Sequence, residues 1–176
     1  MHDRIRRELQ RLATRRVVIP TVLVALLCMA GFQWRDARLG GLELLDTRQW
    51  YTPEQAAALF GALDRLDSRA RAVYAWTEVS IDMIFPAAYG LLFALLLLSL
   101  FGDRRRFYLL PIAGATADVF ENLSITLLAS TYDGDPTSWT RVAAAFTLLK
   151  SGLILATLAA AVGGVIRRLW VSRRRA

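Results

Sequence analysis

The sequence predicts an all-α polytopic membrane protein, in which four transmembrane helices form a bundle and an amphipathic helix lies outside the cytoplasm. Four apolar segments are long enough to cross a bilayer, which takes about 20 helical residues. Hydrophobic residues make up 55% of the 176 positions, and arginine clusters flank the apolar segments. The length of the chain suggests one domain, so we expect one integral membrane domain over residues 1–176.

The four predicted spans cover residues 17–34, 80–101, 107–129 and 142–166. No small-residue cleavage motif follows the first span, so we expect it to stay attached rather than be removed as a signal peptide. The first and second spans are separated by a long loop, residues 35–79, and the last two by a short one.

The distribution of arginine predicts the orientation. Six arginines lie in residues 4–16, three in 104–106 and five in 167–175, whereas the segment 131–140 contains none. Because basic residues accumulate on the cytoplasmic side, we expect both termini in the cytoplasm and the loops 35–79 and 131–140 outside. The preference for arginine over lysine indicates a bacterial source, and hence the inner membrane. We expect the arginine-rich tails to be solvated or to contact lipid headgroups.

The outer loop contains a predicted helix over about 53–66. Thr52-Pro53-Glu54-Gln55 has the pattern of an N-cap, a proline in the first turn and a capping-box glutamine. Apolar residues then recur at helical spacing, at Ala56, Leu59, Phe60, Leu63 and Leu66. A second helix is expected to begin at Asp67-Ser68 and to run into the second span, where Pro86 would kink it.

Charged residues inside the apolar segments mark the candidate site. Asp118, Glu121 and Asn122 lie in the third predicted span and Lys150 lies in the fourth. An ionisable group at the centre of a bilayer costs about 2.5–3.5 kcal/mol, so each needs a partner or a polar cavity. At a rise of about 1.5 Å per residue these four residues share one depth. We therefore predict an ion pair between Lys150 and Glu121 or Asp118.

A second polar stripe follows the start of the second span. Its members recur at helical spacing, at Tyr74, Glu78, Asp82, Phe85 and Tyr89. We expect the two stripes to line a polar cleft that opens outward, with Glu78 an ordinary residue of the membrane interface. The alternative is that these polar groups only hold the helices together.

Two roles are assigned within this set. Asp118, Glu121 and Lys150 are the candidate catalytic residues, because two interacting carboxyls can supply an acid and a base. Asn122, Asp82 and Tyr89 are the candidate ligand-binding residues.

Cofactors and nucleic acid are not expected. The chain has one cysteine, Cys28, and one histidine, His2, so no metal site can be built on these ligands. The arginine clusters lie against membrane segments and match no nucleic-acid recognition motif. The expected partners are membrane lipids, a small apolar ligand, and a second copy contacted through Gly152, Ala156, Ala160 and Gly164.

Two motifs carry a resemblance. The stretch Asp82-x-x-x-Pro86-x-x-Tyr89-Gly90 and the stretch Asp118-x-x-Glu121-Asn122 resemble motifs of small four-span bacterial membrane proteins. That resemblance implies a four-span fold and brings no catalytic roles. The general plan is also similar to small sterol-isomerase-like membrane proteins, whose motifs this chain does not match.

Three functions remain open at this point. A pocket could bind or transform a small apolar or lipid-like molecule. The buried charges could belong to a proton or solute transport component, although only the outer half of the predicted spans is polar. The chain could also be a non-catalytic partner subunit that uses its outer loop for contact.

Overall fold

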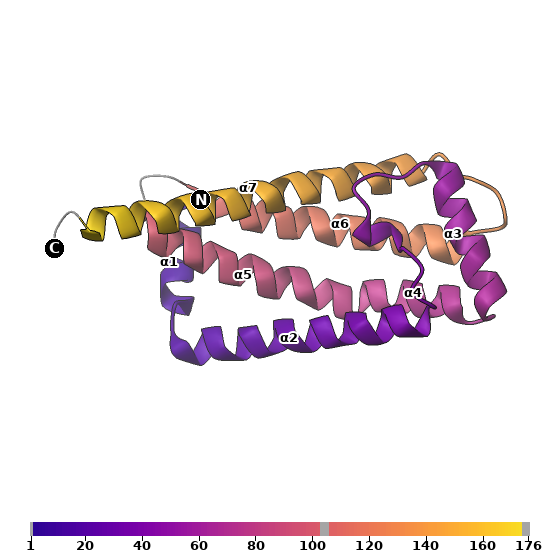
Figure 1. Ribbon diagram of the computed structural model, residues 1–176, viewed down its shortest axis with the longest axis horizontal. Coiled ribbons are helices and arrows are strands. Elements are labelled where there is room, and N and C mark those ends of the chain that lie inside the picture. Colours follow the sequence, from indigo (N-terminus) through magenta and orange to yellow (C-terminus); the bar gives the residue numbers. More distant parts are fainter. Residues whose placement is uncertain (1, 103–105, 174–176) are drawn as a thin grey trace.

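The chain folds into helices joined by turns and short loops, with no strand among its described residues. The computed structural model describes residues 2–102 and 106–173. Four helices lie side by side along the long axis (Figure 1): α2 (Arg15–Arg38), α5 (Ile81–Phe101), α6 (Leu109–Thr131) and α7 (Thr140–Arg173). α1 (His2–Leu12) lies at one end and α3 (Pro53–Leu66) at the other, while η1 (Leu45–Thr47) and α4 (Ala70–Val79) complete the described elements.

Three helical segments of the described chain are long and apolar enough to cross a membrane. They are Arg15–Arg38, Ala70–Phe101 and Thr140–Ser172. α6 has 23 residues but is not among them, because Asp118, Glu121 and Asn122 interrupt its apolar sequence. Large apolar side chains lie exposed along α2 and α7, and such extended apolar surface indicates contact with lipid.

The predicted outer-loop helix is present with the predicted boundaries. The backbone N–H of Gln55 donates to Thr52 Oγ1 at 3.3 Å, and Gln55 Oε1 accepts from the Thr52 N–H at 2.8 Å, which completes the capping box. The apolar face of α3 is buried except for Leu66. Just before α3, burial raises the pKa of the Tyr51 phenol, so this side chain stays protonated.

The arginine-rich N-terminal tail is helical, and one face of it packs on the rest of the chain while Arg4, Arg7 and Arg11 stay exposed. Residues 2–12 form α1, and Leu9 is buried against Leu97, Leu98 and Tyr108. Ile5 and Leu9 are four residues apart and so share one helix face, which packs on the end of α5. Four arginines of the predicted basic clusters lie outside the described residues: Arg104, Arg105, Arg174 and Arg175.

The helix expected to run unbroken from Asp67-Ser68 into the second span is instead divided at Ser80. Ser80 has φ −115 and ψ −83 and separates α4 from α5, whereas α5 continues through Pro86. A proline has no N–H, so the carbonyl of Asp82, four residues earlier, loses its helical donor. Asn122 Nδ2 of α6 donates to that carbonyl at 2.5 Å. The proline therefore leaves an acceptor that ties α5 to α6.

The hydrogen bond from Asn122 yields a prediction about stability. Asn122→Ala should lower the free energy of unfolding by about 1–3 kcal/mol, because a buried carbonyl is left without a donor. In a Pro86→Ala background the new backbone N–H can donate to the same carbonyl, so the loss should be clearly smaller. Circular dichroism of unfolding in detergent measures this double-mutant cycle.

Ser124→Ala is the matched control, because this exposed hydroxyl on the same helix donates only to the Phe120 carbonyl. It should change the free energy of unfolding by no more than about 0.5 kcal/mol. Equal losses for Asn122→Ala in both backgrounds would contradict the coupling to Pro86.

Candidate functional site

The first part of the site is built around the guanidinium of Arg35, in the last turn of α2. This side chain is 2% exposed. Its Nη1 lies 3.0 Å from Glu78 Oε1 on α4, and its Nη2 lies 2.9 Å from Asp46 Oδ2 on η1. Asp82 Oδ2, at the start of α5, is farther away, at 3.7 Å from Nη1. One cation thus connects four segments of the chain.

A tight reversal of the chain after α2 brings Asp46 back to Arg35. Gly40 and Gly41 have φ values of 69° and 67°, a conformation that residues with a side chain rarely adopt. The buried phenol of Tyr74 then fixes η1, since it accepts from the Leu45 N–H at 3.1 Å and donates to Asp46 Oδ1 at 2.9 Å. The turn and the tyrosine together set the position of the Asp46 carboxylate.

The second part of the site is built around Lys150 of α7. Its Nζ forms an ion pair with Glu121 and lies 3.3 Å from Asp118 Oδ1, so the predicted ion pair is confirmed. Thr147 Oγ1 donates to Glu121 Oε1 at 2.6 Å, and the Tyr89 hydroxyl donates to Asp118 Oδ2 at 3.0 Å. Lys150 also donates to the Asp46 carbonyl at 3.4 Å, which joins the two parts.

Acids outnumber bases in this buried cluster. Its five carboxylates belong to Asp46, Glu78, Asp82, Asp118 and Glu121, and each of these side chains is at most 9% exposed. Among the described residues, the cations that pair with them are Arg35 and Lys150. Burial of an uncompensated charge is costly. The cluster therefore contains more carboxyl groups than cations to compensate them.

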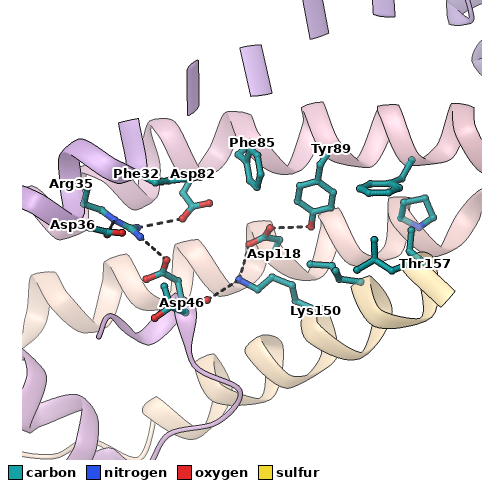
Figure 2. A pocket seen from close by; sticks show the side chains of 15 residues that line it. Phe32, Arg35, Asp36, Asp46, Asp82, Phe85, Tyr89, Asp118, Lys150 and Thr157 are labelled. Atoms are coloured by element: carbon teal, nitrogen blue, oxygen red, sulfur yellow. Dashed lines mark hydrogen bonds and ion pairs between the residues drawn. The ribbon is translucent and has the colours of Figure 1, made fainter. Parts of the chain in front are cut away.

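A cavity of about 410 Å³ lies beside this cluster, between α2, α5, α6 and α7. Its charged end is lined by Arg35, Asp36, Asp46 and Asp82, and Figure 2 shows these side chains together. Asp118, Lys150 and Tyr89 lie farther along the cavity. The remaining lining is mostly apolar, and away from the charged end it consists of Phe93, Pro111, Ile154, Thr157 and Leu158. The cavity is thus charged at one end and apolar at the other.

The structure separates the predicted site residues into two groups. Asp82, Asp118, Tyr89 and Lys150 line the cavity. Glu121 and Asn122 are 0% exposed and do not line it. Glu121 instead holds Lys150, and Asn122 holds the Asp82 carbonyl. Only the first group can touch a molecule in the cavity.

Sequence reasoning missed Arg35 and Asp46 and misjudged Glu78. The first predicted span ended at Trp34, which left Arg35 in the outer loop, whereas α2 continues to Arg38. Glu78 was expected at the membrane interface but is 0% exposed and paired with Arg35. The signal was weak but present, because the loop 35–79 contains six arginines against seven acidic residues, enough for internal pairing.

The carboxylates of Asp46, Glu78 and Asp82 come close enough to be considered as metal ligands. One oxygen from each lies within 4.8 Å of the others. Arg35 pairs with all three, so its guanidinium already supplies the positive charge at the point where they converge. This geometry favours an arginine-centred cluster over a metal centre.

Four small residues of α7 were predicted to contact a second copy of the chain. Two of them pack within the chain and two are exposed. Gly164 packs on α5 so closely that an added Cβ would lie 2.8 Å from Phe101 Cε2, and Ala160 also packs within the chain. Gly152 and Ala156 are exposed. Of the four residues, these two are the ones that face away from the rest of the chain, and the homodimer stays a prediction.

Comparison of the chain with protein-family models, with curated proteins and with solved structures gave no match. The resemblance suggested by the two motifs therefore stays a prediction. The function has to be inferred from the residues and the cavity themselves.

The cluster around Arg35 yields a second prediction. Arg35→Met should lower the free energy of unfolding by about 3–5 kcal/mol, because it leaves Asp46, Glu78 and Asp82 without their shared cation. Arg38→Met is the matched control on the same helix, since Arg38 is 57% exposed and lies 3.5 Å from Asp67. It should cost less than about 1 kcal/mol. Similar losses for both variants, measured by unfolding in detergent, would contradict a central role for Arg35.

Proposed function

We propose that this chain is a bacterial inner-membrane protein whose four-span bundle binds an amphiphilic, lipid-like molecule. The spans are α2, α4 with α5, α6 and α7, and both termini lie in the cytoplasm. α3 lies outside and covers the outer end of the bundle. Three of these spans are apolar by composition, and the fourth, α6, has buried polar groups that face its neighbours.

The assignment of α6 as a span follows from where its polar side chains point. Asp118, Glu121 and Asn122 are all buried within the protein and paired with α5 or α7. Its exposed side chains include Phe120, Leu123 and Leu127, which are apolar. A helix whose polar face is covered by other helices and whose free face is apolar is suited to a lipid environment.

The proposal of a lipid-like ligand rests on the size and the lining of the cavity. Pockets for small ligands typically enclose about 300–1,000 Å³, and this one encloses about 410 Å³. Its charged and apolar ends match the two ends of an amphiphile. α5 lines the cavity from Asp82 at the charged end to Phe93 at the apolar end, so a ligand would lie along the bundle.

Any chemistry on such a ligand would fall to Asp118 and Lys150. Both reach the cavity, and the Tyr89 hydroxyl donates to Asp118 from the opposite side. Glu121 does not line the cavity. Its role would be to orient Lys150.

The topology is tested by cysteine labelling. In a Cys28→Ser background, Ser68→Cys and Ser138→Cys should react with a membrane-impermeant maleimide on intact spheroplasts. Ala13→Cys and Ser172→Cys should react only after lysis. All four positions are exposed in the structure. Labelling of Ser138→Cys only after lysis would contradict the proposed orientation of α6 and α7.

The ligand is tested by mass spectrometry of molecules that co-purify with the protein in mild detergent. Leu158→Trp should expel a discrete amphiphile, because Leu158 lines the apolar end of the cavity. Leu155→Trp is the matched control, since Leu155 is 69% exposed on the same helix and does not line the cavity. The same bulk phospholipids in the wild type and both variants would contradict a specific pocket.

A further inference from the structure

Asp82 is the least satisfied carboxylate on the cavity wall. It is 7% exposed, and its side chain accepts no hydrogen bond from any described residue. Its nearest cation is Arg35, at 3.7 Å, which is beyond hydrogen-bond distance. This is the longest ion pair of Arg35, and a buried carboxylate that is so weakly compensated is costly. Figure 2 shows this side chain directed into the space that the other lining residues surround.

The two cations of the site, Arg35 and Lys150, make their short contacts with acids other than Asp82. Arg35 makes its close contacts with Glu78 and Asp46, at 3.0 and 2.9 Å. Lys150 pairs with Glu121 and Asp118. Neither can move closer to Asp82 without giving up a shorter contact, so carboxyl groups outnumber cations at the charged end of the cavity.

Aromatic rings line the cavity next to Asp82. Phe85 contacts Phe32 on one side and Tyr89 on the other, with ring centroids 5.3 and 5.4 Å apart. All three rings line the cavity. Phe32 precedes Asp82 in the sequence, and Phe85 and Tyr89 follow it. Ring faces attract organic cations, and ammonium groups are the usual ligands of such aromatic walls.

We propose that the ligand is a cationic amphiphile whose ammonium group pairs with Asp82 beside Phe85 and Tyr89. Its hydrocarbon part lies along Phe93, Ile154 and Leu158. This inference rests on the proposed function and adds the charge of the head group. An anionic head would meet the excess of carboxylates, and a neutral one would leave Asp82 with only its long ion pair to Arg35.

Four probes with the same twelve-carbon chain test the proposal: dodecylammonium, dodecyltrimethylammonium, dodecanol and dodecanoate. Binding to the purified full chain in a neutral detergent is measured by native mass spectrometry. The two ammonium probes should bind about tenfold or more tightly than dodecanol, and dodecanoate should bind least. Phosphatidylethanolamine is added as a competitor, and its displacement of dodecylammonium would identify a lipid head group rather than a free amine as the source.

Asp82→Asn should reduce binding of the ammonium probes about tenfold and leave dodecanol unchanged. Asp133→Asn, an exposed acid in the loop after α6, is the matched control and should change neither. Phe85→Leu provides a second test that keeps the charge and should weaken dodecyltrimethylammonium most.

The outcomes separate the two proposals. Equal binding of dodecanol and the ammonium probes to the wild type would overturn the cationic head group and leave the lipid-like ligand standing. Binding of no probe, or binding that Leu158→Trp does not reduce, would overturn the pocket itself.

Discussion

The fold depends on the need to compensate buried charge with very few cations. Arg35 alone connects α2, η1, α4 and the start of α5, because its planar guanidinium can donate to several carboxylates at once. A lysine could not reach the same set of acids, since its ammonium is a single point of charge. The long loop 35–79 is therefore held against the helices by an ionic centre as well as by apolar packing.

Lys150 plays the corresponding role deeper in the protein. It joins α7 to Asp118 and Glu121 of α6, and its contact with the Asp46 carbonyl links it to the Arg35 cluster. The two cations leave the carboxylates in excess, and the least satisfied one, Asp82, lies on the cavity wall. Structural pairing and the proposed ligand binding would thus use neighbouring acids differently.

In α5, a carbonyl that lacks its helical hydrogen bond makes a contact with a neighbouring helix. Pro86 removes the donor for the Asp82 carbonyl, and Asn122 of α6 replaces it. Nearby, Gly90 allows α6 to approach α5 so closely that an added Cβ would lie 2.8 Å from the Cβ of Ala115. A proline, an asparagine and a glycine fix the contact of two helices that carry Asp82, Tyr89 and Asp118. The wall of the cavity is therefore positioned by contacts that do not themselves touch a ligand.

Much of the helical framework could be read from the sequence. Apolar length placed the long helices, and the pattern from Thr52 to Gln55 placed α3 with its capping box, because these signals depend only on neighbouring residues. The pairing of Lys150 with Glu121 and Asp118 also followed, since helical rise fixes depth along each span.

Only the tertiary structure decided the rest. The turn at Gly40 and Gly41 returns Asp46 to Arg35, the helix breaks at Ser80, and Glu78 is buried rather than interfacial. The helical period gives the face of a residue but not which distant segment will cover that face. Which acids share Arg35, and which one is left facing the cavity, therefore depends on how the loop folds back on the helices.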